Sequence, residues 1–216
     1  MTLRDFSYRA TELHPSKIRD VAELGMGDPA VIPPWFGEAA WRSPVQAIEA
    51  AKTSLDGDPT HYQPNSGHPA LRESIAGYLS HLHRISVPAA RITVTASGMQ
   101  GLLLAAQTLV EPGDHVVMIT PDWPNIGAAF AIAGAEVAKV SLQVDQGRWS
   151  LDLGRLIEAL TPQTRCLMIN PPNNPTGWTL SADDRNKVVE HCRRHGIWIV
   201  ADEVYNHLYR HGEAAP

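Results

Sequence analysis

The sequence predicts an α/β protein, in the form of a three-layer sandwich with helices on both faces of a mainly parallel sheet. Two observations support this prediction. From residue 91 onward, short β-rich runs alternate with helical runs, and most of the β-rich runs are nearly continuous in Val, Ile, Leu and Met. Strands of that kind are buried on both faces, and their alternation with helices implies right-handed crossovers between parallel strands.

The predicted elements follow one another regularly after an irregular start. Residues 1–35 carry four prolines, and we expect them to form an irregular arm beside a larger domain of residues 36–216. Strands are expected at 91–95, 115–120, 136–141, 165–169 and 197–201. Helices are expected at 44–55, 69–83, 99–110, 125–133, 153–160 and 181–195.

The composition excludes several classes of protein. A chain of 216 residues with 44% hydrophobic content can bury a substantial core. The net charge of −5 gives no attraction to nucleic acid or to an anionic membrane. There is no spanning-length apolar run and no secretory signal, so the cytoplasm is the expected location. Cys166 and Cys192 lack the spacing of metal ligands, and we expect buried thiols and no metal site.

Candidate ligand-binding residues are those directly after each strand, because open α/β sheets bind ligands at the carboxyl ends of their strands. The first strand passes through Ser97 and Gly98 straight into a helix. The free N–H groups of such a helix start, the serine hydroxyl and the helix dipole could hold a phosphate. A plain helix cap is the alternative. The segment lacks the lysine of a Walker loop and the glycine spacing of a dinucleotide loop.

Three later segments add polar and aromatic groups at the same edge. Trp123 follows the second strand, where its ring could stack on an aromatic cofactor or pack in the core. Residues 170–177, Asn-Pro-Pro-Asn-Asn-Pro-Thr-Gly, form a rigid turn that would hold an amide in a fixed direction toward a phenolate oxygen. Asp202 ends the last strand, where a protonated ring nitrogen would satisfy its carboxylate; capping of the next helix is the alternative.

The Asn-Pro-Thr-Gly turn and the Asp-Glu-Val-Tyr strand end resemble the signature of the class I/II aminotransferases. These are fold-type I enzymes that use pyridoxal 5'-phosphate (PLP). The resemblance runs from about residue 20 to the end, with the motifs in the family's order. It implies the large PLP-binding domain of that fold, a homodimer, and transfer of an amino group between an amino acid and a 2-oxo acid.

The resemblance also implies a role for each residue around the cofactor ring. Asn174 resembles the asparagine that hydrogen-bonds the phenolic oxygen of PLP, and Tyr205 resembles the tyrosine that contacts the same oxygen. Asp202 resembles the aspartate that keeps the pyridine nitrogen protonated, which makes the ring an electron sink. Trp123 is similar to the aromatic residue that stacks on the ring.

Other positions resemble the family's phosphate and substrate contacts. Ser97, Gly98 and Met99 are similar to the phosphate-binding turn, with Gln100 as an addition. Tyr62 looks like the tyrosine that reaches the phosphate of the neighbouring subunit's cofactor, with an ordinary surface or packing tyrosine as the alternative. Gly27 resembles the glycine that lines the substrate carboxylate pocket.

The sequence departs from the family after Asp202. The Schiff-base lysine of the family lies a few dozen residues further on, whereas 216 − 202 = 14 residues follow here and none is a lysine. That lysine anchors the cofactor and acts as the general base. We therefore expect a truncated domain, without the small C-terminal domain, that does not complete the reaction alone. The lysines present are expected on the surface: Lys17, Lys52, Lys139 and Lys187.

Two alternatives to an aminotransferase stay open. A PLP-dependent lyase, synthase or decarboxylase on the same fold would use the same electron sink. A non-catalytic remnant would keep the binding residues without turnover. The sequence does not predict which amino acid or oxo acid would be the substrate.

Overall fold

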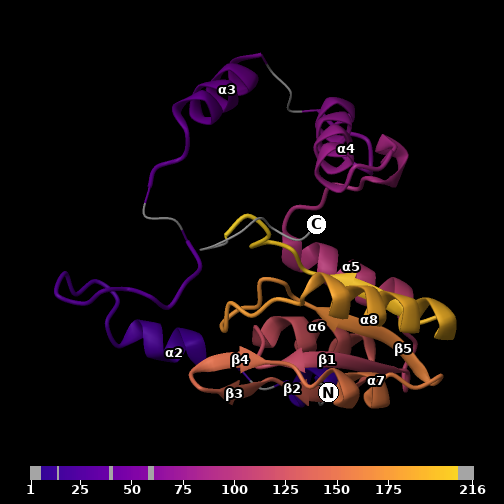
Figure 1. The fold of residues 1–216 in the computed structure, drawn as a ribbon. Coiled ribbons are helices and arrows are strands. Elements are labelled where there is room, and N and C mark those ends of the chain that lie inside the picture. The colour runs from indigo at the N-terminus through magenta and orange to yellow at the C-terminus, as the bar shows by residue number, and fades with distance from the viewer. Residues whose placement is uncertain (1–5, 14, 39–40, 58–60, 209–216) are drawn as a thin grey trace, which may run out of the picture. The chain divides into compact units, whose positions relative to one another are not determined.

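The structure is a computed structural model that describes residues 6–13, 15–38, 41–57 and 61–208 (Figure 1). The chain divides into two compact units. The first comprises residues 1–14 and 95–216 and contains the sheets; the second comprises Pro15–Val94 and is helical.

A four-stranded sheet forms the centre of the first unit. Its order is β2-β1-β5-β6, and every adjacent pair is parallel. In the register, Val117 lies opposite Ala138 on one side and Leu167 on the other. The predicted α/β class with a mainly parallel sheet is confirmed. The strands are β1 (His115–Thr120), β2 (Glu136–Ser141), β5 (Thr164–Ile169) and β6 (Trp198–Ala201).

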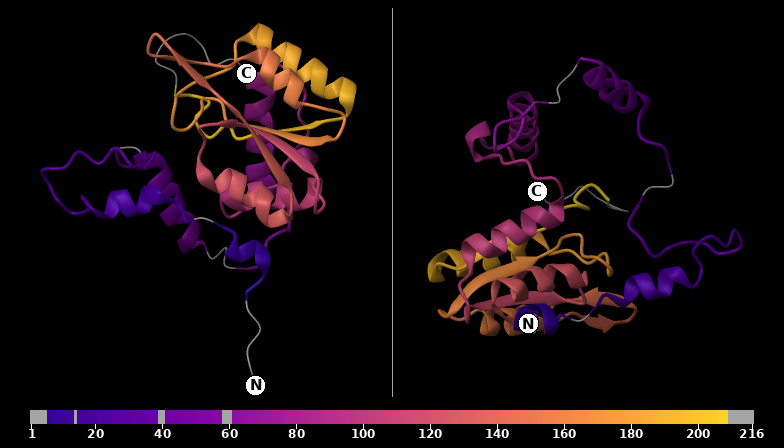
Figure 2. Two further views of the ribbon diagram at one scale, coloured as in Figure 1. Left: turned by 90° about the horizontal axis from the view of Figure 1, so that it is seen from below. Right: turned by 180° about the vertical axis from the view of Figure 1, so that it is seen from behind.

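Helices cover both faces of this sheet, as the left view of Figure 2 shows. Successive side chains of a strand point to opposite faces, so Val116 and Met118 join one core while Val117 and Ile119 join the other. The first core packs against α5 and α6, and the second against α7 and α8. The result is the predicted three-layer sandwich. The helices are α5 (Gly98–Leu109), α6 (Pro124–Ala133), α7 (Leu153–Ala159) and α8 (Ala182–His195).

Capping residues explain why these helices begin and end close to their predicted positions. Side chains at the N-caps accept backbone N–H bonds: Ser181 Oγ accepts from Asp184 N at 3.1 Å, and Asp152 Oδ1 from Arg155 N at 3.1 Å. Gly134 and Gly196 end α6 and α8 in the left-handed conformation, with φ of 98° and 68°.

The strand predicted at 91–95 is wrong. A short 3-10 helix, η1 (Ala89–Arg91), precedes a stretch that pairs with no strand among the described residues. Other groups bond its backbone: the Arg72 guanidinium donates to Ala89 O at 2.7 Å and to Ile92 O at 2.9 Å, and Val94 N donates to Ser66 O at 2.9 Å. The β propensity of this run is insufficient because a strand also needs a neighbour to pair with.

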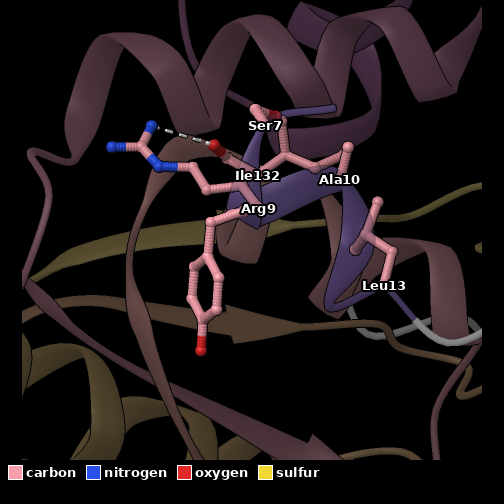
Figure 3. Close-up of a pocket in the computed structure, with 6 residues that line it drawn as sticks. Ser7, Arg9, Ala10, Leu13 and Ile132 are labelled. Atoms are coloured by element: carbon pink, nitrogen blue, oxygen red, sulfur yellow. Dashed lines mark hydrogen bonds between the residues drawn. The ribbon is translucent and has the colours of Figure 1, made fainter. Parts of the chain in front are cut away.

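The irregular start predicted for residues 1–35 is wrong at two short helices, whereas residues 24–35 are irregular as predicted. They are α1 (Tyr8–Thr11) and α2 (Lys17–Glu23). Ser16 caps α2 by accepting from Ile18 N at 3.4 Å. This N-cap residue indicates a helix start, but the prolines of the segment led to the prediction of irregular structure. α1 packs on α6 within the first unit, where Arg9 Nη1 donates to Ile132 O at 3.3 Å beside a hollow of about 500 Å³ (Figure 3).

A hairpin in the first unit was not predicted. Strands β3 (Gln143–Asp145) and β4 (Arg148–Ser150) pair antiparallel. The two residues between them, Gln146 and Gly147, have φ of 48° and 77°. Positive φ at both central residues is typical of the tight hairpin turn whose twist matches its strands.

The second unit contains the two helices expected there, α3 (Val45–Asp56) and α4 (Pro69–His83). Pro69 occupies the first turn of α4, where its missing N–H breaks no helical bond.

Two further predictions can be compared with the structure. Cys166 and Cys192 are buried free thiols, as predicted. Within the described parts of the chain, no helix is long and apolar enough to span a membrane.

Candidate functional site

The N-terminus of α5 and the carboxyl end of β6 border one hollow of about 310 Å³ in the first unit. Gly98 and Gly101 line it from α5, and Ala201, Asp202 and Glu203 line it from the end of β6. The hollow therefore lies at the carboxyl edge of the parallel sheet, where ligands of such sheets bind. Among the described residues that line the larger hollow beside α1, Arg9 is the only charged one, and its guanidinium donates to a helix carbonyl.

A set of hydrogen bonds shapes the turn before α5. Ser97 Oγ accepts from Gln100 N at 3.1 Å, Gln100 Oε1 accepts from Ala96 N at 2.8 Å, and Thr95 Oγ1 donates to Ser97 O at 2.8 Å. Because Ser97 Oγ acts as acceptor in this bond, its own hydrogen can still be donated to a ligand. The sequence predicted Gln100 as a cofactor contact, and the structure gives it a bond that holds the turn.

The same turn is open on the side of Gly98. A Cβ added at Gly98 would meet nothing within 4 Å. The first N–H groups of a helix have no acceptor within the helix, so those of Gly98 and Met99 could donate to an anion, whose charge the positive end of the helix dipole would favour. Donors, dipole and open space together fit a phosphate group.

Asp202 is held at the end of β6 by its own backbone and side chain. Its N–H donates to Ile169 O at 2.9 Å, which continues the parallel ladder past the strand. Its Oδ1 accepts from Val204 N at 3.2 Å, and the side chain is half-buried against the hollow. This bond fixes the carboxylate and leaves its second oxygen to accept from a ligand.

The turn that carries Asn174 is tied to Asp202 through Asn170. Asn170 Oδ1 accepts from Asn174 N at 2.8 Å, and Asn170 Nδ2 donates to Asp202 O at 2.7 Å. Asn173 closes the turn internally, since its Oδ1 accepts from Thr176 Oγ1 at 2.6 Å. The structure thus links the backbones of Asn174 and Asp202 through one side chain. The sequence analysis did not predict a role for Asn170. Its position directly after a strand, where ligand-binding residues are expected, could have indicated one.

The two aromatic candidates of the first unit lie at the start of a helix and in the turn after Asp202. Trp123 is the N-cap residue of α6, and its partly buried ring packs against the core beneath α5 and α6. Tyr205 is half-buried in the turn after Asp202. Asp122, which was not predicted, is half-buried next to Trp123; burial raises its pKa above the ordinary value, and the charge of Lys139 partly offsets this.

Two predicted residues belong to the second unit, and their roles, like those of the other site residues, remain predictions. Tyr62 is fully exposed in that unit, and Gly27 adopts φ of 91°.

The four lysines are exposed, as predicted. Two of them pair with carboxylates of their own helices: Lys52 lies 2.8 Å from Glu49, and Lys187 lies 3.3 Å from Asp184. Among the described residues, no group of His, Cys, Asp and Glu is arranged to hold a metal.

Comparison with known proteins identifies the family. The model of the family "Aminotransferase class I and II" matches residues 36–216. This chain belongs to that family.

Individual relatives carry aminotransferase names. The chain is 33% identical over 193 residues to the aspartate aminotransferase of Pyrococcus horikoshii, a match that covers 89% of this chain and 46% of the relative. It is 34% identical over 166 residues to a probable N-succinyldiaminopimelate aminotransferase of Mycobacterium tuberculosis, covering 76% and 42%.

A solved structure agrees with the sequence relatives. The aspartate aminotransferase from Thermus thermophilus with maleate superposes with a TM-score of 0.89 at 30% identity, covering 98% of this chain and 56% of that chain. This chain therefore spans about half the length of the relatives it matches.

Proposed function

We propose that this chain supplies the PLP-recognising part of a PLP-dependent aminotransferase, which transfers an amino group between an amino acid and a 2-oxo acid. The observation that carries the proposal is the hollow shared by the α5 turn and Asp202, with the Asn174 turn tied to Asp202. PLP presents an anionic phosphate, a phenolic oxygen and a basic ring nitrogen. The first unit offers a complement to each.

The phosphate is assigned to the α5 turn. The N–H groups of Gly98 and Met99 and the hydroxyl of Ser97 would donate to its oxygens, and the helix dipole favours its charge. Gln100 keeps this turn in shape through its bond to Ala96 N. A phosphate placed there would lie at the rim of the hollow that Asp202 also borders.

The ring is assigned to Asp202, Asn174, Tyr205 and Trp123. The Asp202 carboxylate would accept from the ring nitrogen and hold a proton there, because an anion beside that nitrogen favours its charged form. The Asn174 amide and the Tyr205 hydroxyl would donate to the phenolic oxygen, and Trp123 would stack on one face of the ring. PLP, when bound, supplies the electron sink that stabilises a carbanion at the α-carbon of the substrate.

The remaining parts of the proposal rest on family membership. In a cytoplasmic homodimer, Tyr62 would reach the phosphate of the neighbouring subunit's cofactor, and Gly27 would line the substrate carboxylate pocket. Residues 36–216 would belong to the PLP-binding domain, and residues 1–35 to an arm.

Binding of pyridoxamine 5'-phosphate tests this proposal. This ligand has an amine in place of the aldehyde of PLP, so it cannot react with surface lysines, and its affinity reports on the pocket alone. We expect saturable binding, and a loss of about tenfold or more in Asp202→Asn, because a bond to a charged group is worth about 1.5–3 kcal/mol. Asp145→Asn, an exposed carboxylate of the hairpin, is the matched control. Equal affinity of the two variants, or no binding by the wild type, would contradict the proposal.

A further inference from the structure

Asn170 is a buried side chain whose amide joins two separate elements of the first unit. Only 8% of its surface is exposed, and it directly follows β5. It bonds the turn residue Asn174, four positions further on, and the strand-end residue Asp202, 32 positions further on. Both partners carry side chains that the proposed function assigns to the cofactor ring.

The partners of Asn170 fix the direction of its amide. The backbone N–H of Asn174 can only donate and the backbone carbonyl of Asp202 can only accept, so rotation of the amide by 180° would oppose like groups at both ends. In a buried position each lost bond leaves an unsatisfied polar group, which makes the alternative orientation costly. The side chain is therefore a bridge of defined length between two backbone positions.

We propose that Asn170 is a positioning residue of the cofactor site, which fixes the separation of the Asn174 amide from the Asp202 carboxylate so that both act on one ring. This inference rests on the proposed function. Asn170 is not among the described residues that line the hollow; it would act through the backbones of the two residues whose side chains are assigned to the ring.

Asn173 provides an internal comparison for this role. It lies in the same turn and is equally buried, with 5% of its surface exposed. Its Oδ1 accepts from Thr176 Oγ1 and its N–H donates to Trp178 O at 2.8 Å, so its bonds stay within the turn region and do not reach β6. A substitution of Asn173 therefore perturbs the turn and leaves the link between Asn174 and Asp202 in place.

Aspartate is the sharpest substitution because it keeps the size of asparagine and accepts but does not donate. Asn170→Asp retains the acceptor for Asn174 N, loses the donor to Asp202 O, and sets a carboxylate oxygen against that carbonyl. Asn173→Asp adds the same charge to the same turn and retains the acceptor that Thr176 uses. The two variants therefore differ in whether the bond between residue 170 and Asp202 O is lost.

The experiment is a double-mutant cycle on binding of pyridoxamine 5'-phosphate by the full chain. Asn174→Ala and Asp202→Asn are measured singly and together in the wild type, in Asn170→Asp and in Asn173→Asp. We expect affinity to fall about tenfold in Asn170→Asp and less than about twofold in Asn173→Asp. We expect a coupling of about threefold or more between positions 174 and 202 in the wild type and in Asn173→Asp, and none in Asn170→Asp. A merely structural role would weaken binding without removing the coupling.

Amide hydrogen exchange without ligand separates this inference from the proposed function. Asn170→Ala should accelerate exchange of the Asn174 N–H and leave the Gly177 N–H, which donates to Asn173 O at 2.7 Å, protected. Unchanged exchange at Asn174, or an intact coupling in Asn170→Asp, overturns the positioning role. If the wild type fails to bind the ligand, the proposed function fails, and the exchange result alone then decides whether Asn170 is the bridge.

Discussion

Gly98 and Asp202 line the same hollow although 202 − 98 = 104 positions separate them in the sequence. The parallel sheet explains this proximity. Asp202 directly follows β6 at its carboxyl end, and α5 begins at Gly98 beside that end, so the first turn of a helix and a carboxylate border one space. This relation underlies each of the functional predictions below.

Ser97→Ala should weaken ligand binding only when the ligand carries a phosphate. The variant loses the N-cap acceptor of α5, which costs about 1 kcal/mol of stability, together with the hydroxyl that would donate to the phosphate. We expect a severalfold loss of affinity for pyridoxamine 5'-phosphate and no change for pyridoxamine, measured by titration. Ser181→Ala removes the same kind of cap from α8 and should cost similar stability with no effect on either affinity. Equal losses of affinity for pyridoxamine 5'-phosphate in both serine variants would show that Ser97 does not contact the phosphate.

Gly134→Ala should destabilise the fold more than Gly196→Ala. Both glycines end a helix with positive φ, 98° and 68°, so the backbone strain of an added Cβ is comparable, about 1 kcal/mol. At Gly134 the Cβ would also lie 3.1 Å from Pro112 Cα and 3.2 Å from the Arg9 guanidinium, whereas at Gly196 nothing lies within 4 Å. Urea unfolding of the two variants measures the difference, and equal stabilities would show that neither Pro112 nor Arg9 restricts the space at Gly134.

The sequence predicted the sheet well because its signals are local. Val117 and Met118 belong to an apolar run whose two faces are both buried, and Ser181 and Gly196 mark the ends of a helix by their own chemistry. The run around Ile92 failed because pairing depends on a partner strand. Asn170 was missed for a related reason: its role comes from a bond to Asp202, and the sequence does not show which distant carbonyl an asparagine will reach.

The two thiols should be unreactive in the folded protein at neutral pH. Burial raises the pKa of Cys166 to about 12 and that of Cys192 to about 11, from an ordinary value of 9.0. The reactive thiolate is therefore scarce until unfolding. Because both folded pKa values are raised, the stability that the neutral thiols contribute is complete below pH 9 and is lost as pH rises toward 11–12.

Thiol titration with a disulfide reagent measures this directly. We expect slow modification of the native protein at pH 7, two rapid equivalents in denaturant, and faster native modification as pH rises above 9. A rapid equivalent at pH 7 under native conditions would show that one of the two sulfurs is accessible and not buried in the sheet core.

The most direct test of the central claim is the protonation state of the ring nitrogen of bound pyridoxamine 5'-phosphate. Nitrogen-15 NMR of ligand labelled at that atom reports it at a pH where the ring of the free ligand is unprotonated. If Asp202 holds a proton there, the wild-type complex shows a protonated ring nitrogen, and the Asp202→Asn complex shows an unprotonated one. An unprotonated nitrogen in the saturated wild-type complex, or the same signal in both complexes, would contradict the claim that this carboxylate recognises the cofactor ring.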